Sequence, residues 1–152
     1  MIEAEITKDL LVAFLNDLRK EDKLELDEFF KNNTLDDFLN ICLEDKNLTY
    51  FLLDDNKKPL ALGGAYKVND KVARVWFLAT NQIKKSKIAL YKYVLNKILF
   101  FKKQFAFLYN FIFKSNFSSL KWLKKAGFQV LDLDVPDYKL FYFNKGDNCF
   151  DI

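Results

Sequence analysis

The sequence predicts a mixed α/β (α+β) domain over residues 1–152, with the element order β-α-α-β-β-β-α-β-α-β-β and one parallel crossover. Three observations predict it. Two stretches with helical spacing come first, three strand-like runs separated by turn residues follow, and a strand–helix–strand unit spans residues 72–112. Such a unit is a right-handed connection between parallel strands, so it inserts one parallel pair into an otherwise antiparallel sheet.

The first segment is a short apolar run, Ile2 to Ile6, that leads into two helices. Thr7 can cap the first helix, whose apolar residues follow helical spacing: Leu10, Leu11, Phe14, Leu15 and Leu18. Thr34 can cap the second, because Asp36 and Asp37 then occupy the first turn, where the helix dipole favours negative charge. The second helix takes its apolar face from Phe38, Leu39, Ile41 and Cys42.

Three β-rich runs come next: "LTYFLL", "PLALGGAYKV" and "VARVWFLAT". The turn signals "DDNKK" and "ND" separate them, which predicts an antiparallel meander of three strands. Gly63 and Gly64 lie in the middle of the second run and are not followed by the Lys-Ser/Thr pair of a nucleotide loop. They indicate a bulge or a close approach of another backbone segment.

The remaining elements complete the crossover and the sheet. A helix is expected from Ser86 to Phe101, with the apolar stripe Ile88, Tyr91, Val94 or Leu95, and Ile98. The strand "FAFLYNFIF" follows, and then a helix from Asn116 to Ala126 that ends at Gly127, a residue suited to the left-handed conformation. Two final strands are expected in "FQVLDLD" and "YKLFYF".

Charge is sorted along the chain. Residues 1–56 hold 15 acidic and 6 basic residues, residues 57–128 hold 1 acidic and 16 basic residues, and residues 129–152 hold 5 acidic and 2 basic residues. The abundance of lysine is typical of AT-rich codons, but codon bias does not sort charge by position. The middle segment is therefore expected to carry a positive field suited to phosphates, and the first segment a negative one.

Several kinds of function are disfavoured by composition. The sequence has no histidine, which removes the usual general base and metal ligand, so no metal site is predicted. Cys42 and Cys149 have no metal-type spacing and are expected to be free thiols in a reducing compartment. No apolar run reaches about 18 residues and no leader is recognised. We therefore expect a soluble, intracellular protein without membrane attachment.

The stretch "NFSSLKWLKKAGF" carries a recognisable register. Asn116 is followed by Ser119 three residues later, and by Gly127 and Phe128 at eleven and twelve residues. This register and the order of elements resemble the GNAT superfamily of acyl-CoA-dependent N-acyltransferases over nearly the whole chain. The resemblance implies a GNAT-like mixed sheet, acetyl-CoA as cosubstrate, and a cofactor contact at Asn116. A small branch of GNAT-like proteins encoded by bacteriophages is also similar, which opens an alternative as a catalytically degenerate virion or assembly protein.

The family's phosphate loop aligns with Lys84, Lys85, Ser86, Lys87, Ile88 and Ala89. In the family, backbone N–H groups of this loop and the helix N-terminus hold the CoA pyrophosphate. The basic first position and Ala89 agree with the pattern, whereas Lys87 replaces the central glycine. Two outcomes stay open: the lysine side chains substitute for backbone contacts and CoA binds, or the site is degenerate and the lysines are solvated.

The end of the fourth strand is the second implied cofactor contact. The resemblance implies that the backbone of Leu78, Ala79 and Thr80 pairs with the pantetheine amides where this strand splays from the next one. Across the splay, Asn110 lies in a very apolar strand and needs a polar partner. It either faces the acyl cleft or is satisfied by backbone.

Acid–base equipment is weak. The family's tyrosine, which reprotonates the CoA thiolate, aligns with Leu123, and the fourth strand holds no acidic residue. Tyr109 and Ser119 are the weak candidates for the general acid. Positioning alone supplies much of the rate when a neutral amine attacks a thioester.

The acceptor is expected to be cationic. The stretch "RKEDKLELDEFF" places acidic residues on the acceptor side implied by the family, where they either attract an amine of a small molecule or protein, or form a solvated helix face. Nucleic-acid binding is disfavoured, because no binding motif accompanies the lysines. The predicted location is cytoplasmic, or the virion if the alternative holds.

Overall fold

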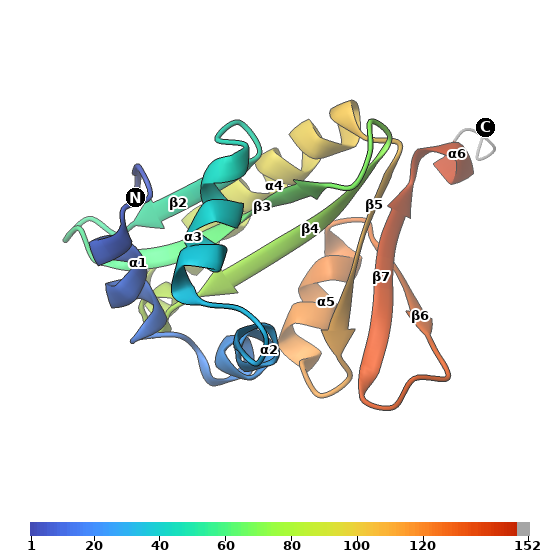
Figure 1. The fold of residues 1–152 in the computed structure, drawn as a ribbon. Helices are drawn as coiled ribbons and strands as arrows, with labels where there is room; N and C mark the ends of the chain where they lie inside the picture. The colour runs from blue at the N-terminus through green and yellow to red at the C-terminus, as the bar shows by residue number, and fades with distance from the viewer. Residues whose placement is uncertain (149–152) are drawn as a thin grey trace. The chain divides into compact units, whose positions relative to one another are not determined.

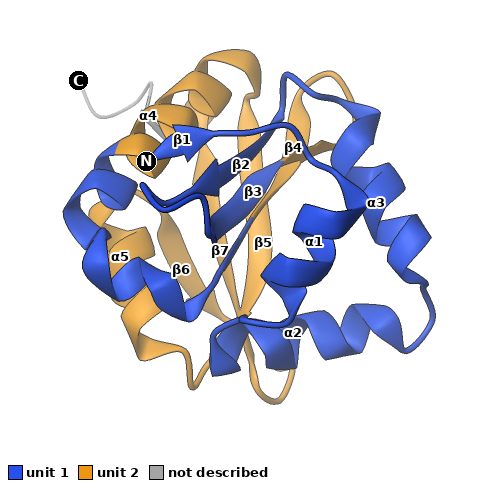
Figure 2. Ribbon diagram, turned by 90° about the vertical axis from the view of Figure 1, so that its left-hand side faces the viewer, with its two compact units in different colours: residues 1–64, 77–92 blue, residues 65–76, 93–152 orange. Residues whose placement is uncertain are grey.

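A computed structural model describes residues 1–148 of the protein, so the expected thiol of Cys149 lies outside the described residues. The chain forms two units, each assembled from two stretches of sequence (Figure 2). Unit 1 comprises residues 1–64 and 77–92. Unit 2 comprises residues 65–76 and the described residues from 93 onward.

The described strands form one seven-stranded mixed sheet with the order β1-β2-β3-β4-β5-β7-β6 (Figure 1). Their bounds are β1 Ile2–Glu3, β2 Thr49–Leu53, β3 Pro59–Lys67, β4 Val72–Ala79, β5 Phe107–Phe113, β6 Gln129–Asp132 and β7 Tyr138–Asn144. The pair β4 and β5 is parallel, while β1/β2, β2/β3, β5/β7 and β6/β7 are antiparallel. The predicted fold class and its parallel crossover are therefore confirmed.

Two predicted N-caps are present in unit 1. Thr7 precedes α1 (Lys8–Leu15), and its hydroxyl accepts from the Leu10 N–H at 3.3 Å. Thr34 precedes α3 (Leu35–Glu44) and forms a complete capping box with Asp37, in which each side chain accepts from the other residue's backbone N–H. Each cap satisfies N–H groups that have no partner inside the helix, which is why these helices begin where they do.

An additional helix, α2 (Lys20–Phe30), lies between the two predicted ones. The expectation of two N-terminal helices missed it: Leu26, Phe29 and Phe30 follow helical spacing, but they form a short apolar pattern in a largely charged stretch, and Leu24 is exposed. Leu26 is buried, and the rings of Phe29 and Phe30 pack against Phe38 of α3 at 5.7 and 5.9 Å. Tertiary packing therefore stabilises a helix whose own apolar pattern is short.

The first helix ends earlier than predicted. Helix α1 stops at Leu15, and Leu18 forms an isolated antiparallel bridge with Thr80. Leu18 is therefore extended rather than helical. The segment after α1 is a short strand-like stretch at the end of β4, and its contacts are described with the site.

Glycine at position 64 is explained by a close approach of backbone, as predicted. Gly64 pairs with Thr49 across β2 and β3. A Cβ atom at this position would lie 2.2 Å from the Leu48 carbonyl oxygen and 3.0 Å from the Thr49 Cα. The irregularity of this pair of strands lies at Leu52 and Leu53, so the glycine pair is not itself a bulge.

The long crossover helix, α4 (Lys87–Gln104), buries Val94 and Ile98 of the predicted stripe but not Ile88. Ile88 is 75% exposed, and the buried residues of the helix are Leu90, Val94, Ile98 and Phe101. A 3-10 helix, η1 (Asn81–Lys85), precedes α4 and places Ile88 in its first turn. Since each residue advances a helix by about 100°, Ile88 points about 200° away from Leu90. The predicted stripe was therefore out of phase at its start.

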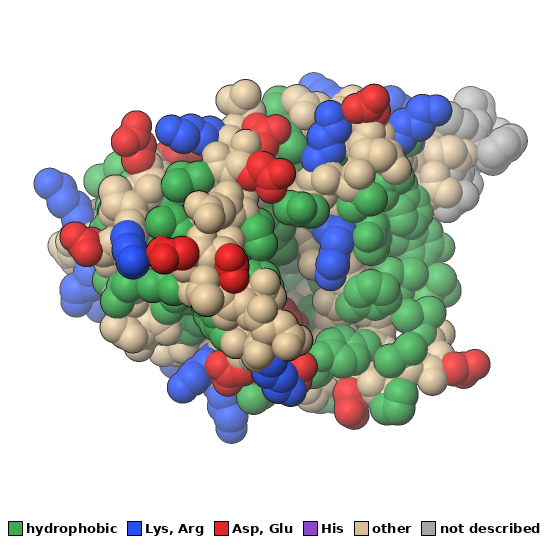
Figure 3. Space-filling view, viewed as in Figure 1, with side chains coloured by type: hydrophobic (Ala, Val, Ile, Leu, Met, Phe, Trp, Pro, Cys, Tyr) green, Lys and Arg blue, Asp and Glu red, His purple; other side chains and the backbone are tan. Residues whose placement is uncertain are grey.

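The side chains on the two faces of β5 in unit 2 differ in how deeply they are buried. Leu108 and Ile112 are buried on one face, and Phe107, Tyr109, Phe111 and Phe113 alternate with them on the other. Phe107 stacks on Tyr142 of β7 at 5.9 Å, and Phe113 stacks on Tyr138 at 4.6 Å. Phe111 stays 43% exposed. Hydrophobic side chains gather over β5 and β7 at the right of the space-filling view (Figure 3).

Helix α5 (Phe117–Lys125) begins and ends as predicted. Asn116 is its N-cap and accepts from the Ser119 N–H at 3.3 Å. Gly127 follows the helix with φ +93°, a conformation that favours glycine. The Lys102 ammonium of α4 donates to the Ala126 carbonyl at 3.1 Å and lies 4.7 Å from the centre of the Phe143 ring. The chain described ends with α6 (Lys145–Asn148).

The thiol of Cys42 provides a test of the core of unit 1. Cys42 is fully buried in α3, and burial raises its pKa to about 12. In a Cys149→Ser variant, we expect native protein at pH 8 to react with a thiol reagent more slowly than a free cysteine, by a factor on the order of 1000. Timed labelling followed by mass spectrometry measures this, with guanidinium-unfolded protein as the control. Labelling of native protein within minutes would contradict the described burial.

Candidate functional site

The junction between β4 and α4 is built around a buried threonine in unit 1. Thr80 is 0% exposed, and its hydroxyl donates to the Pro59 carbonyl at 2.8 Å and accepts from the Gln82 N–H at 3.2 Å. Thr80 thereby caps η1, and Ser86 ends η1 just before α4 begins. Sequence reasoning placed Thr80 at the strand end but missed its role as a cap.

The three lysines at this junction carry exposed, unneutralised charge. Lys84 and Lys85 lie in η1, and Lys87 is the first residue of α4. The first turn of α4 holds no acidic residue, and no carboxylate in residues 1–148 forms an ion pair with any of the three. The helix dipole adds further positive potential at the same place. The junction therefore has the electrostatics of an anion site, with no anion supplied by the described chain.

Lys87, which the sequence resemblance aligns with a central glycine, lies in ordinary helical backbone. Among the described non-glycine residues, positive φ occurs at Lys57 and Asp137, so Lys87 does not need the conformation that glycine provides. Its side chain is exposed. The first intrahelical bond runs from the Leu90 N–H to the Ser86 carbonyl at 2.9 Å. The N–H groups of Lys87, Ile88 and Ala89 therefore precede the helical hydrogen-bond ladder.

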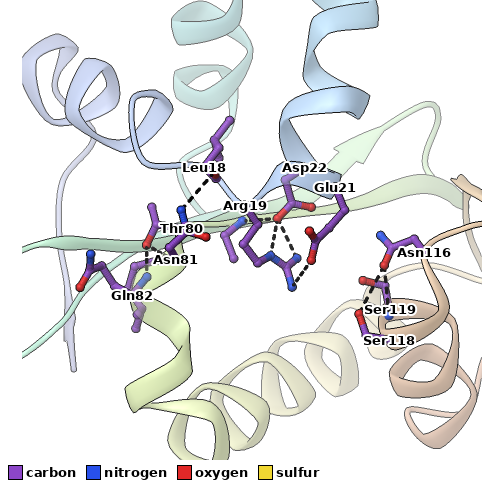
Figure 4. A network of polar contacts seen from close by, with 12 residues as sticks. Leu18, Arg19, Glu21, Asp22, Thr80, Asn81, Gln82, Asn116, Ser118 and Ser119 are labelled. Carbon is purple, nitrogen blue, oxygen red and sulfur yellow. Dashed lines mark hydrogen bonds and ion pairs between the residues drawn. The ribbon is translucent and has the colours of Figure 1, made fainter.

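The segment between α1 and α2 contacts the first residues of η1, where the junction between β4 and α4 begins. The Asn81 N–H donates to the Asp17 carbonyl at 3.0 Å, and the Gln82 side-chain amide donates to the Asp17 carboxylate at 2.9 Å. Figure 4 shows Leu18 beside Thr80, Asn81 and Gln82. These contacts tie the segment between α1 and α2 to the residues that follow β4.

The same segment reaches the edge of β4 at Ala79. The Arg19 N–H donates to the Ala79 carbonyl at 3.0 Å, and the Ala79 N–H donates to the Asp22 carboxylate at 2.9 Å. Thr80 points its own N–H the other way, to the Leu60 carbonyl of β3 at 3.0 Å. Because backbone direction alternates along a strand, Leu78 shares the direction of Thr80, and Ala79 presents its groups at the opposite edge.

Asp22 is a buried acid held by an arginine. It is 2% exposed, and the Arg19 guanidinium donates to its Oδ2 from both Nε and Nη2 at 2.7 Å. Arg19 also pairs with Glu21 at 3.6 Å, and the three side chains are drawn together in Figure 4. Burial raises the pKa of Asp22 above its ordinary value, while Arg19 and the Ala79 N–H act to lower it. Hydrogen bonds thus compensate a charge that burial penalises.

Sequence reasoning had assigned Asp22 to an acidic wall or a solvated helix face. The structure divides the acidic residues of α2: Asp27 and Glu28 are exposed, whereas Asp22 is buried. The Arg-x-x-Asp spacing at the start of α2 is a signal that could have indicated an ion pair within one helical turn. It could not have indicated the contact with Ala79.

In unit 2, the structure decides the open question about Asn110. Its amide donates to the Val75 carbonyl at 2.9 Å, and its Oδ1 accepts from Arg74 at 3.0 Å and from the Phe111 N–H at 2.7 Å. The parallel register of β4 and β5 joins Val72–Arg74 to Phe107–Tyr109. Beyond that point the Asn110 side chain, rather than a backbone group, takes the next β4 carbonyl. Asn110 is therefore satisfied by protein groups.

The remaining candidate residues of unit 2 lie on α5 and β5 or at the start of α5. Asn116 is buried and its Oδ1 accepts from the Ser119 N–H, while Ser118 lies beside it at 3.5 Å (Figure 4). Leu123, which the sequence resemblance aligns with a tyrosine, is buried in α5. Tyr109 lies on the aromatic face of β5 with the Arg74 guanidinium 5.9 Å from its ring centre.

The described residues offer neither a metal site nor a membrane-spanning helix. Within the described residues, no group of three or more His, Cys, Asp or Glu side chains is placed to hold a metal ion. Among the helices of the described chain, none is both long enough and apolar enough to cross a membrane.

The fold is shared with solved N-acetyltransferase structures. The GNAT domain of S. lividans PAT matches with a TM-score of 0.65 at 13% identity, over 90% of this chain and 84% of that one. A chimera of spermidine N-acetyltransferase SpeG from Vibrio cholerae and hSSAT matches with a TM-score of 0.61 at 15% identity, over 98% and 99%. Campylobacter jejuni N-acetyltransferase PseH, solved in complex with acetyl coenzyme A, matches with a TM-score of 0.53 at 17% identity, over 87% and 96%.

No protein-family model matches the sequence, and no curated protein matches it. The likeness to GNAT acetyltransferases is thus a likeness of fold, at low sequence identity. It confirms the predicted resemblance to the GNAT superfamily at the level of architecture. Acetyl transfer is the activity named for these neighbours.

Proposed function

We propose that the protein transfers an acetyl group from acetyl-CoA to a primary amine. The observation that carries the proposal is the junction between β4 and α4, where Lys84, Lys85 and Lys87 surround a helix start without any acidic partner in the described chain. Three uncompensated cations beside a positive helix end are unfavourable unless an anion binds. A diphosphate supplies that charge, and backbone N–H groups of a helix start suit it as well.

The residues fit a CoA diphosphate by charge and by chemistry. Lys84, Lys85 and Lys87 would hold it by charge-assisted hydrogen bonds, together with the N–H groups that precede the first bond of α4. Ile88, which is 75% exposed in the same turn, offers an apolar contact. Ala89 and Ser86 complete the proposed phosphate segment. Leu78, Ala79 and Thr80 stay the proposed strand contact for pantetheine, with Ala79 as the residue whose backbone groups face away from β3. Asn116 stays the proposed contact in unit 2.

The reaction asks little acid–base help of the protein. The neutral amine attacks the thioester carbonyl, the C–S bond breaks, the amine loses a proton, and the CoA thiolate takes one up. Tyr109 and Ser119 remain the candidate acids. Because both partners are bound beforehand, orientation lowers the barrier even where proton transfer passes through water.

A cationic acceptor is proposed from charge. Residues 1–56 carry a net charge of −9, and the exposed acids Asp27 and Glu28 on α2 belong to this segment. A negative surface raises the local concentration of amines such as lysine side chains or polyamines. One structural neighbour is named for spermidine, which agrees with this class of acceptor.

Calorimetric titration with CoA tests the proposal. We expect wild-type protein to bind CoA, and a Lys84→Gln, Lys85→Gln, Lys87→Gln variant to bind at least about tenfold more weakly, since loss of about 1.4 kcal/mol is a tenfold change. The matched control is Lys121→Gln, Lys124→Gln, Lys125→Gln, which removes the same charge from exposed positions of α5. An equal loss in both variants would mean non-specific attraction. If the wild-type protein shows no heat of binding with CoA, the proposed acetyltransferase activity is overturned. The role as a virion or assembly protein would then be the alternative to test.

A further inference from the structure

The C-terminal end of β4 already has a partner within its own unit. Thr80 directs its N–H to Leu60 of β3, so the groups at the other edge belong to Ala79. A ligand that adds its amides to this edge would need the Ala79 carbonyl as acceptor and the Ala79 N–H as donor. Both groups are engaged in the structure, by Arg19 and Asp22 respectively.

The segment between α1 and α2 behaves as a short added strand. Asn81 donates to the Asp17 carbonyl, Arg19 donates to the Ala79 carbonyl, and Leu18 bridges to Thr80 between them. One position departs from strand pairing. The acceptor for the Ala79 N–H is the carboxylate of Asp22, which comes from the first turn of α2 rather than from a neighbouring strand.

We propose that Asp22 is a positioning residue that sets the affinity for CoA, because its carboxylate occupies the Ala79 N–H that a pantetheine amide would otherwise use. The inference rests on the proposed function. It assigns to Asp22, together with the backbone of Arg19, a role in competition with pantetheine for the backbone groups of Ala79. Binding of pantetheine at Ala79 therefore includes displacement of Asp22.

The Asp22 carboxylate is held firmly against the Ala79 N–H, yet a pantetheine amide can displace it. Asp22 is 2% exposed, and two Arg19 nitrogen atoms lie 2.7 Å from its Oδ2, so protein groups alone hold the carboxylate in place. A side-chain acceptor can turn away about its χ angles without breaking a β-ladder, which a backbone acceptor could not do. The cost of that turn subtracts from the affinity for CoA.

The test compares CoA affinity in variants of one helical turn. We expect Asp22→Ala to bind CoA about tenfold more tightly than wild type in a calorimetric titration, because the Ala79 N–H becomes available. Glu21→Ala is the matched control, since it removes the same charge next to Arg19 but does not contact Ala79. Equal tightening in both variants would be an effect of net charge and would overturn the role of Asp22.

A second variant guards against unfolding. Asp22→Ala leaves Arg19 without its main partner, so the double variant Arg19→Gln, Asp22→Ala removes both charges and is expected to show the same tightening. Thermal melts establish that each protein is folded. Wild type and both Asp22 variants binding CoA with equal affinity would overturn this inference while leaving the proposed function standing. No binding by any of them would overturn the proposed function and this inference with it.

Hydrogen exchange supplies a readout that needs no CoA. In wild-type protein the Ala79 amide is expected to be protected, and in Asp22→Ala its exchange should accelerate at least about tenfold more than that of the Thr80 amide, which bonds to Leu60. Unchanged protection of Ala79 in this variant would show that Asp22 does not hold the strand edge. That result would overturn the inference whatever the titrations show.

Discussion

Replacing Gly64 with alanine is expected to destabilise the protein by at least about 3 kcal/mol, at the upper end of what overpacking costs. The added Cβ would lie 2.2 Å from the Leu48 carbonyl oxygen and 3.0 Å from the Thr49 Cα. Both obstacles are backbone atoms, of Thr49 in β2 and of Leu48 just before it, so no side chain can turn aside to relieve the clash. The strands β2 and β3 must separate locally, which weakens their antiparallel ladder where Thr49 pairs with Gly64.

Thermal denaturation followed by circular dichroism measures this effect. For a chain of this length, about 3 kcal/mol corresponds to a midpoint lowered by roughly 6–12 °C. Gly146→Ala is the control, because there the added atom would be 3.3 Å from the end of the half-buried Asn144 side chain, which can move. A midpoint within about 2 °C of wild type for Gly64→Ala would show that β2 and β3 do not approach as described.

Truncation of Phe14 to alanine should also be severe, at about 3–5 kcal/mol. Phe14 is 0% exposed on α1, and its ring meets Phe51 of β2 edge-on at 5.8 Å between centres. The substitution removes buried apolar surface, leaves a cavity, and loses the aromatic pair. The packing of α1 on the sheet in unit 1 depends on this contact.

Chemical denaturation gives the free energy of unfolding directly. We expect a lower denaturant midpoint with an unchanged slope, since the surface exposed on unfolding stays nearly the same. Val12→Ala on the same helix is the matched control, because Val12 is 39% exposed, and it should change stability by no more than about 0.5 kcal/mol. Similar losses in the two variants would mean that α1 does not present Phe14 to the core.

The candidate site combines features that sequence patterns reveal with one that they hide. The lysines at the start of α4 are visible as an electrostatic anomaly, and the structure leaves them without acidic partners in the described chain. The engagement of Ala79 by Asp22 and Arg19 is visible only once the chain is folded. If acetyl-CoA is the cosubstrate, these two features act in opposite directions, one attracting the diphosphate and the other resisting pantetheine.

Local chemistry explains what the sequence alone could establish. Thr7 and Thr34 as caps, Gly127 after α5, the close approach at Gly64 and the parallel crossover all follow from rules that act over a few residues or over one connection. The mixed fold class followed from these elements in order. Only the start of the α4 stripe was predicted wrongly: Val94 and Ile98 are buried, whereas Ile88 lies in the first turn after η1 and is exposed.

Long-range contacts decided the rest. The burial of Asp22 depends on the Ala79 amide, 57 positions away in the sequence. Helix α2 depends on aromatic rings that contact Phe38. The position of β7 between β5 and β6 depends on pairing across the sheet. The sequence determined the elements and the sorting of charge, because these depend on neighbours along the chain. Only the tertiary structure determined which polar groups are engaged, because a hydrogen bond needs both partners placed in space.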